Sequence, residues 1–315
     1  MSEGEKELRA WINSTRPAGT MKPYRTYGKQ FVEWCQREGK TALPATPEAV
    51  GNFMRYCAVE RARPLAASTV INGVKSAISH MHVQAGLPTP TTHPLVKETA
   101  AAVKRVGKTV SHAKKPLSTE MWAEMLRTSS YTVEDWRNLA LLGLMTVAML
   151  RQSEAIALRA EDLWVEELDE AGGRKRDVMF VLITKSKTDQ ERRGETVVVA
   201  ASDNYNTCAV RVVRQWLLIR QQSSEYVFHK LNSDKPLKNQ EPNAIMKREV
   251  ERIGYDPKPY GSHSARKGGA TAAVARGVEM HLLKRHGRWR SDAVYAYITD
   301  SLAARLSVSL NLLDK

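Results

Sequence analysis

The stretch YGSHSARKGGATAAVARGVEMHLLKRHGRWRSDAVYAYI, residues 260–298, contains the side chains that decide how this chain is interpreted. His263 and Arg266 are three residues apart, so on a helix both side chains leave one face and can reach the same anion. The small residues at 268–275 predict that this helix continues. A lone His-x-x-Arg pair is more often a surface pair or a helix cap than a site. Its meaning therefore depends on what accompanies it, beginning with the GRW triplet at 287–289 and Tyr297.

Arg151 and Glu154 follow an apolar run, residues 138–150, that predicts a buried helix ending just before the arginine. An interfacial ion pair is the simplest interpretation. The chemical alternative is that Arg151 and Arg266 clamp one phosphate, because planar guanidinium groups match phosphate oxygens and stay charged at any working pH. Glu154 would then orient an arginine.

Lys187 lies in the polar turn KSKTDQERRG, residues 185–194. Two strand-like runs, 178–184 and 195–200, flank this turn and predict an antiparallel hairpin. Most lysines in turns are simply solvated. A hairpin can, however, hold a flexible cation over a cleft, and Lys187 is singled out by the residues that accompany it.

In order and approximate spacing, these residues resemble the tyrosine recombinases, the phage integrase family. The resemblance covers the domain layout of the whole chain, but its specific motifs lie in the second two-thirds. It implies that two arginines bind the scissile phosphate, the lysine is a general acid, the histidine assists proton transfer, the tryptophan contacts the phosphate and the tyrosine attacks. These roles fall on Arg151, Arg266, Lys187, His263, Trp289 and Tyr297, with Glu154 behind them. SKTDQ at 186–190 and GRWRSDAVYAYI at 287–298 further resemble recombinases of eukaryotic mobile elements, the DIRS and crypton types.

One departure from the family pattern leaves alternatives open. The step from Trp289 to Tyr297 is one residue shorter than the usual gap. Tyr295 therefore competes as nucleophile, although we expect it to be a packing residue, and His286 competes with Trp289. Lys185 is a rival of Lys187, which better matches the hairpin position.

The first third of the chain predicts a helical bundle with almost no strand. Apolar residues recur at helical spacing near residues 21–38, 46–59, 67–85 and 95–106. In the third segment the buried stripe is Val70, Val74, Ile78 and Met81. A structural or protein-binding module and a DNA clamp both fit this pattern.

A basic segment, KRVGKTVSHAKKPLS at 104–118, separates this bundle from the rest and predicts a linker. We expect domains at 1–107 and 118–315, joined by residues 108–117. Helices at 118–128, capped by Ser118, and at 133–150, together with the hairpin, make the second domain mostly α with a small antiparallel sheet. The resemblance implies an all-α core-binding domain and an α+β catalytic domain that form a C-shaped clamp on DNA.

Composition agrees with a double-stranded DNA partner. The 315 residues carry a formal net charge of +14, the footprint expected for a phosphate-rich ligand, although many ordinary proteins have a basic surface. We expect DNA contacts from Lys104, Arg105, Lys108, Lys114, Lys115, Arg288 and Arg290.

No cofactor or membrane is expected. Cys35, Cys57 and Cys208 are scattered without metal-ligand spacing, and the two GKT triplets lack the upstream glycine of a phosphate loop. The longest apolar run is too short to span a bilayer. We therefore expect a soluble, intracellular protein, nuclear in a eukaryote and otherwise with the nucleoid.

After Tyr297, the four leucines Leu302, Leu306, Leu310 and Leu313 form a stripe at helical spacing. This helix can pack against its own domain. The resemblance implies instead that the tail docks into a neighbouring protomer, which would join dimers or tetramers on DNA.

The resemblance implies a site-specific recombinase that cuts and rejoins DNA through a 3′-phosphotyrosyl link, for integration or excision of a mobile element. A type IB topoisomerase uses similar chemistry to relax one duplex. A catalytically inactive DNA-binding derivative is the other alternative, which the intact residue set disfavours.

Overall fold

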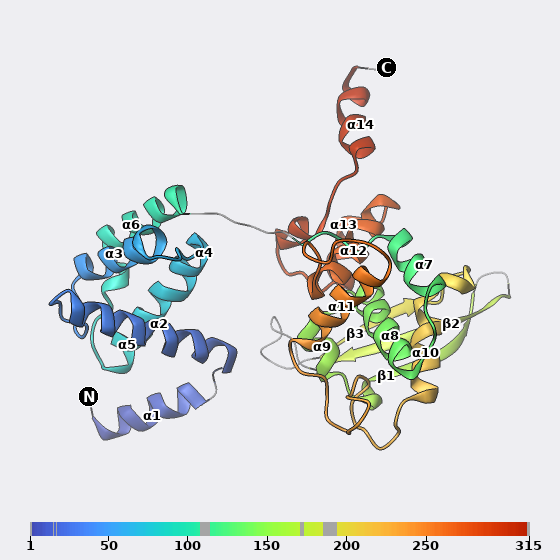
Figure 1. The fold of residues 1–315 in the computed structure, drawn as a ribbon, viewed down its shortest axis with the longest axis horizontal. Helices are drawn as coiled ribbons and strands as arrows, with labels where there is room; N and C mark the ends of the chain where they lie inside the picture. The colour runs from blue at the N-terminus through green and yellow to red at the C-terminus, as the bar shows by residue number, and fades with distance from the viewer. Residues whose placement is uncertain are drawn as a thin grey trace. The chain divides into compact units, whose positions relative to one another are not determined.

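The chain folds into two compact units, residues 1–111 and 112–315, each with its own hydrophobic core (Figure 1). The structure is a computed structural model, and it describes residues 2–14, 16, 18–107, 114–170, 173–184 and 194–313. Residues 108–113 of the expected linker, Lys108 among them, lie outside the described residues. The expected bounds of the domains and the linker stay a prediction.

The described part of the first unit is all α. Aromatic side chains that include Phe31, Trp34 and Phe53 pack together in its core. Val70, Val74 and Ile78 of the predicted stripe are fully buried, and Met81 is partly buried against the same core. The helices are α1 Glu3–Ser14, α2 Ala18–Arg37, α3 Pro47–Arg55, α4 Ala67–Thr69, α5 Lys75–Gln84 and α6 Pro94–Val106, with π-helical turns at Tyr56–Glu60 and Val70–Val74 and a 3-10 turn at Pro90–Thr92.

The second unit is mostly helical with one small sheet, as predicted. Its elements are α7 Thr119–Arg127, α8 Val133–Val147, α9 Gln152–Ala157, β1 Leu163–Asp169, β2 Lys175–Ile183, β3 Glu195–Ala200, α10 Ala209–Ile219, α11 Glu241–Arg252, α12 Ser262–Ala275, α13 Met280–His286 and α14 Leu302–Leu313, with 3-10 turns at Ala160–Asp162, Tyr205–Thr207 and Asp292–Tyr297 (η6). Ser118 caps α7 as predicted, since its side chain accepts a hydrogen bond from the backbone N–H of Met121 at 3.2 Å.

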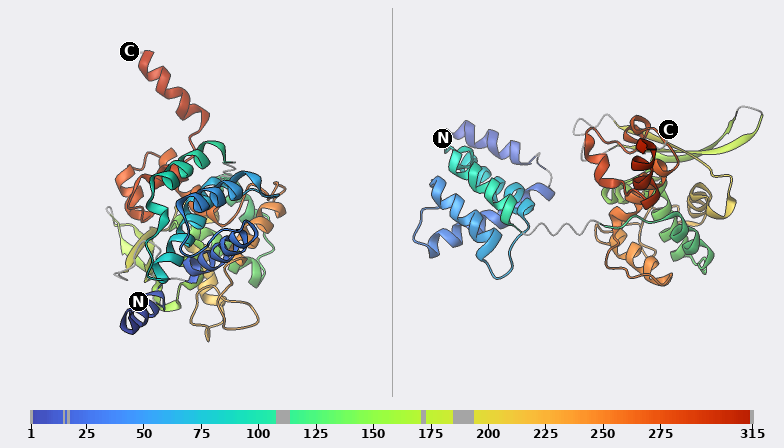
Figure 2. Two further views of the ribbon diagram at one scale, coloured as in Figure 1. Left: turned by 90° about the vertical axis from the view of Figure 1, so that its left-hand side faces the viewer. Right: turned by 90° about the horizontal axis from the view of Figure 1, so that it is seen from above.

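The sheet is antiparallel in the order β1-β2-β3, and β1 was not predicted. Leu163, Val181 and Val197 pair across the three strands and are buried in the core shared with α8 and α10. Figure 2 shows the sheet at the margin of this unit, with helices against one face. The neighbouring row on the other face carries Trp164 stacked on Phe180. Successive side chains of a strand point to opposite faces of the sheet, so burial alternates along β3, because the helices cover only one face.

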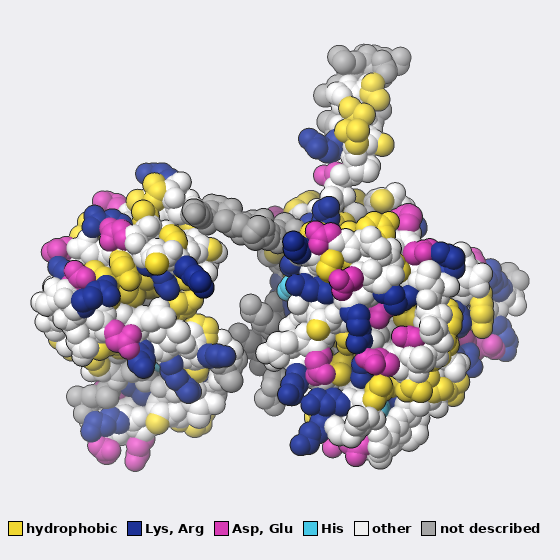
Figure 3. Space-filling view, in the orientation of Figure 1, with side chains coloured by type: hydrophobic (Ala, Val, Ile, Leu, Met, Phe, Trp, Pro, Cys, Tyr) yellow, Lys and Arg dark blue, Asp and Glu magenta, His cyan; other side chains and the backbone are white. Residues whose placement is uncertain are grey.

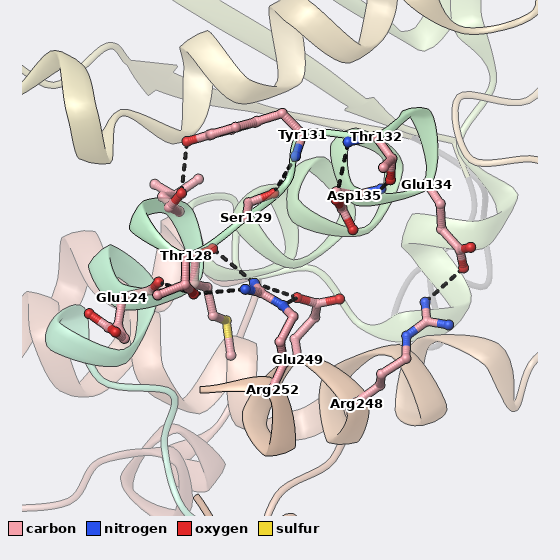
Figure 4. A network of polar contacts seen from close by, with 12 residues as sticks. Glu124, Thr128, Ser129, Tyr131, Thr132, Glu134, Asp135, Arg248, Glu249 and Arg252 are labelled. Carbon is pink, nitrogen blue, oxygen red and sulfur yellow. Dashed lines mark hydrogen bonds and ion pairs between the residues drawn. The ribbon is translucent and has the colours of Figure 1, made fainter. Parts of the chain in front are cut away.

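A polar network joins α11 to the turn between α7 and α8 (Figure 4). The Arg252 guanidinium donates to the hydroxyl of Thr128 at 2.7 Å and to the carbonyl of Met125 at 2.8 Å. It also pairs with Glu249, while Arg248 pairs with Glu134. These bonds hold α11, the helix that precedes α12 in the chain, against the turn between α7 and α8.

The apolar helix α8 ends at Val147, so the prediction that it reaches Leu150 is wrong. Met149 lies in the left-handed region, with φ of 48°, and breaks the helix. The chain then turns so that Arg151 becomes the N-cap residue of α9. The freed carbonyls at the end of α8 accept hydrogen bonds from side chains of the candidate site.

Two glycines let α12 approach its neighbours closely. A Cβ on Gly268 would collide with the carbonyl of Leu117, and one on Gly269 would collide with the carbonyl of Thr146 on α8. We expect Gly269→Ala to lower the free energy of unfolding by about 1–3 kcal/mol, because backbone on both sides must move. Urea denaturation followed by tryptophan fluorescence measures this change.

Gly28 in α2 is the matched control, because a Cβ there would meet nothing within 4 Å. Gly28→Ala should stabilise the protein by about 0.5–1 kcal/mol through helix propensity alone. An unchanged midpoint for Gly269→Ala would contradict the close packing of α12 on α8.

Candidate active site

Arg266 lies at the centre of the candidate site. Its side chain leaves the first turns of α12 and is only 1% exposed. Two guanidinium nitrogens donate to the carbonyls of Met149 and Gly287, which tie α12 to the end of α8 and to the turn after α13. Its Nε has no hydrogen-bond partner among the described residues. A buried guanidinium with an unused donor is suited to receive an anion.

Two aromatic rings lie against this guanidinium. The Cζ of Arg266 is 4.0 Å from the ring centroid of Trp289 and 5.4 Å from that of Tyr297. The two ring centroids are 5.2 Å apart, and the His263 ring lies 6.2 Å from Tyr297. Four of the six predicted catalytic side chains are therefore gathered in one cluster.

Tyr297 ends the turn η6, which is bound to α12. The hydroxyl of Thr271 donates to the carbonyl of Tyr297 at 3.3 Å and accepts from the N–H of Thr299 at 3.2 Å. Tyr295, the competing nucleophile, is 58% exposed, so the expectation that it is a packing residue is wrong. Its ring faces the ammonium of Lys284 at 6.0 Å.

Glu154 holds Arg151 at the edge of the cluster. One carboxylate oxygen accepts from the Arg151 guanidinium at 2.6 Å, and the other accepts from the Arg151 backbone N–H at 2.9 Å. The Glu154 side chain is 1% exposed, and that of Arg151 is 17% exposed. Arg151 thus keeps a solvent-facing edge while its orientation is fixed.

Arg288 is buried rather than available to DNA, and we remove it from the predicted DNA-binding set. The residue is 4% exposed, has a φ of 58°, and directs its guanidinium to Glu154 at 3.0 Å. Its charge and its place beside Trp289 suggested a surface contact. Only the fold reveals the carboxylate, from a segment more than a hundred residues earlier, that pairs with it.

His286 does not join the aromatic cluster. Its Nε2 lies 2.7 Å from the carbonyl of Val147 at the end of α8. Trp289, the other candidate for this position, instead covers Arg266. The geometry therefore favours Trp289 over His286.

The electrostatics of the cluster are those of an anion site. Burial, followed by the charges of Arg151 and Arg288, lowers the pKa of Arg266. Burial would raise the pKa of Glu154, but Arg288 and Arg151 outweigh it and hold that pKa below its usual value. One carboxylate thus stands among three guanidinium groups, and the single negative charge of a DNA phosphodiester would offset part of the remaining positive charge.

His263 is affected by the same charges. The residue is exposed at the surface, yet partial loss of hydration around the ring, followed by the charges of Arg266 and Arg151, lowers the pKa of its imidazole. The ring is therefore neutral near pH 7 and able to accept a proton.

The remaining predicted residues are distributed as follows. Lys187 and its rival Lys185 lie outside the described residues. The Lys114 ammonium donates to the carbonyl of Lys258 at 2.9 Å. The exposed residues among those predicted to bind DNA are Lys104, Arg105, Lys115 and Arg290.

Neither a metal cluster nor a membrane helix is found in the part of the chain that the structure describes. No group of three or more His, Cys, Asp or Glu side chains there could hold a metal ion. No helix there is long and apolar enough to cross a bilayer.

Relatives of this chain are known. An integrase/recombinase xerD homolog of Selenomonas ruminantium is 26% identical over 299 residues, which cover 91% of this chain and 83% of that protein. The recombinase cre of Escherichia phage P1 is 22% identical over 309 residues, which cover 91% of this chain and 85% of that protein. The fold is similar to that of the Tn1549 transposon integrase in complex with transposon right end DNA, with a TM-score of 0.63, 12% identity and 99% of each chain covered. Residues 115–303, more than half of the chain, match the model of the phage integrase family, so this protein belongs to that family, the tyrosine recombinases.

Proposed function

We propose that this protein recombines DNA at specific sites by using Tyr297 to cut one strand and hold it as a 3′-phosphotyrosyl link. The observation that carries the proposal is the position of the Tyr297 ring, 5.4 Å from the Cζ of Arg266 and beside both Trp289 and His263. A phenol placed against a buried guanidinium and an imidazole has a phosphate site and a base within reach.

Arg266 and Arg151 would stabilise the charge that develops during cutting. The attacking phenolate and the pentacoordinate phosphate are both anionic, so fixed cations around them lower the barrier. Arg266 is already held by two carbonyls, and Arg151 is held by Glu154. Little reorganisation would be needed when DNA binds.

Two further side chains would transfer protons, and a third would contact the phosphate. His263 accepts the phenolic proton as the Tyr297 oxygen bonds to phosphorus. Lys187, assigned from the sequence alone, protonates the departing 5′ oxygen. The indole N–H of Trp289 can donate to a phosphate oxygen, and its ring excludes water. The 5′ hydroxyl of another strand then attacks the link, and Tyr297 leaves as the strands are rejoined.

Acidification should slow cleavage through His263. Its pKa lies below the ordinary value of about 6.5, so the ring is neutral at pH 7 and gains its proton only at lower pH. The cleavage rate at subsaturating DNA should therefore be level near neutrality and fall only at a pH below the ordinary pKa of an imidazole. His263→Asn should be slower and lose this acid limb. A fall that persists in His263→Asn would assign it to another group.

The tail helix α14 offers a means of assembly. Leu302, Leu306 and Leu310 are each at least half exposed, and Figure 3 shows apolar side chains along one side of this helix. The side chain of Leu313 lies outside the described residues. A groove of about 1100 Å³ with a mostly apolar lining lies between α7, α8, α12 and α13. We propose that the stripe of one protomer occupies this groove in another and joins dimers or tetramers on DNA.

Leu306→Asp should weaken assembly on DNA by about tenfold or more, because a carboxylate would enter an apolar contact. Ser307→Asp is the control, since it adds the same charge to an exposed residue one position further along the helix. Truncation after Thr299 should abolish synapsis and leave weaker DNA binding. Light scattering of protein on DNA with one or two sites measures these effects. Equal assembly of Leu306→Asp and Ser307→Asp would exclude the tail as the connector.

The whole protein is proposed to surround DNA as a C-shaped clamp, with residues 1–107 on one side and 118–315 on the other. The basic side chains on the surfaces of both units are consistent with this arrangement (Figure 3). Hydroxyl-radical footprints of the full chain test it. Protection confined to one side of the duplex would contradict a clamp.

The function is tested with a nicked suicide duplex that carries candidate element ends, incubated in EDTA and separated on a denaturing gel. A covalent protein–DNA band supports tyrosine chemistry. Strand exchange between two duplexes then separates a recombinase from a type IB topoisomerase, which would relax a supercoiled plasmid without exchange. DNA binding without any adduct at a specific site would indicate the inactive derivative.

We propose further that the protein integrates or excises a mobile element of the eukaryotic DIRS or crypton type. The support is the similarity of SKTDQ at 186–190 and GRWRSDAVYAYI at 287–298 to those recombinases. Such a protein would act in the nucleus. A fluorescently tagged chain expressed in a eukaryotic cell should accumulate there, and exclusion from the nucleus would count against this type.

A further inference from the structure

Arg288 is the buried charge of the site that the proposed chemistry does not use. Its side chain is 2% exposed. One terminal nitrogen donates to the carbonyls of His286 at 3.0 Å and Ala148 at 3.3 Å. The other donates to the carbonyl of Met149 at 3.1 Å and to Glu154 at 3.0 Å. These bonds make Arg288 a bridge between the GRW turn, the end of α8 and the start of α9.

Glu154 connects Arg288 to Arg151. Its Oε2 accepts from both the Arg288 guanidinium and the Arg151 backbone N–H, while its Oε1 accepts from the Arg151 guanidinium at 2.6 Å. Any rotation of this carboxylate moves the atom that holds Arg151. By holding this carboxylate, Arg288 therefore limits the positions that the Arg151 guanidinium can take.

Arg288 is also connected to Arg266. The two guanidinium groups share the carbonyl of Met149, and Arg266 binds the carbonyl of Gly287, directly before Arg288. The left-handed φ of 58° at Arg288 turns its side chain inward, and the next residue, Trp289, covers Arg266. The GRW turn thus carries both Trp289, which covers Arg266, and Arg288, which holds the carboxylate that binds Arg151.

We propose that Arg288 is a positioning residue for DNA cleavage: it does not touch DNA, but sets the geometry of Arg151 through Glu154 and that of Arg266 through the Met149 carbonyl and the GRW turn. This inference rests on the proposed function, in which Arg151 and Arg266 bind the scissile phosphate. The competing explanation is a buried ion pair that only stabilises the fold. Loss of one partner from such a pair is destabilising in either case, so a stability measurement alone cannot separate the two explanations.

Arg288→Met tests the proposal in the full chain. We expect single-turnover cleavage at saturating DNA to slow by about 10–100-fold, the scale seen when supporting residues behind reacting groups are removed, with the Kd for DNA within about threefold. Arg220→Met is the matched control, because Arg220 is also buried, at 8% exposure, and also donates to carbonyls, among them that of Ser224. It should lower the melting temperature without changing the cleavage rate of folded protein.

A pH profile and a double-mutant cycle give readouts that a structural role would not affect. The charges around Glu154 come from Arg288, Arg151 and, nearby, Arg266. Removing Arg288 raises the pKa of Glu154. Arg288→Met should therefore begin to lose activity at a higher pH than the wild type, whose own acid limb comes from His263. Arg288→Met and Glu154→Gln should be strongly non-additive, with the second substitution costing less than about threefold after the first.

Slow cleavage with near-normal DNA binding and non-additivity would support the positioning role. Wild-type cleavage at saturating DNA in folded Arg288→Met would overturn it, as would additive losses with Glu154→Gln. A defect shared by Arg220→Met would also overturn it, because it would trace to stability. Wild-type protein that forms no adduct would remove the proposed function and this inference together, whereas an active wild type with an active Arg288→Met would remove the inference alone.

Discussion

Tyr297→Phe should form no covalent complex with a nicked suicide duplex, while Tyr295→Phe should form it at a rate within about twofold of the wild type. The substitution removes one oxygen, the atom that would bond to phosphorus. The ring that packs against Trp289 and lies over Arg266 is kept. DNA binding should therefore stay near the wild-type level while the chemistry is lost. Denaturing electrophoresis after incubation in EDTA measures the adduct.

Tyr295 is a demanding control because it lies two residues away in the same turn. The residue is 58% exposed and its ring faces Lys284, whereas the rings of His263 and Trp289 lie beside that of Tyr297. An adduct that survives in Tyr297→Phe and disappears in Tyr295→Phe would move the nucleophile to Tyr295. It would also require η6 to rearrange on DNA.

Local spacing explains the parts of the site that could be predicted from sequence. His263 and Arg266 at i and i+3 share a face of α12 because a helix repeats every 3.6 residues. The cap at Ser118 and the stripe through Val70, Val74 and Ile78 follow from equally local rules. Such features depend on neighbours within two or three turns, which a single sequence displays.

The features that were missed depend on distant partners. β1 carries an acidic segment, WVEELD, that shows weak alternation and becomes a strand by pairing with β2. The end of α8 is decided at Met149, whose carbonyl binds arginines from α12 and the GRW turn. Arg288 resembles a surface cation until Glu154, 134 residues earlier, is placed against it. A sequence displays the charge of such a residue but not what neutralises it.

Arg266→Lys should slow cleavage by about a hundred- to a thousandfold, the loss typical when a group that stabilises charge in the transition state is removed. The guanidinium binds two carbonyls at once and still has an unused Nε, whereas a lysine has one nitrogen at the end of a flexible chain. Burial and the charges of Arg151 and Arg288 already lower the pKa of Arg266. The same environment should strip the proton from a lysine, whose ordinary pKa is only about 10.4, well before it would affect a guanidinium.

The defect of Arg266→Lys should consequently deepen as the pH rises, because the neutral amine is favoured further, while wild-type cleavage stays level over the same range. Binding should weaken far less than cleavage, because many phosphates outside the site contribute to the affinity for DNA. Arg127→Lys serves as the control, since Arg127 lies on the surface of α7 and pairs with Glu124. Single-turnover rates at saturating DNA between pH 7 and pH 9 measure the effect. A cleavage rate equal to that of Arg127→Lys would mean that the guanidinium of Arg266, with its several donors, is not needed for the reaction.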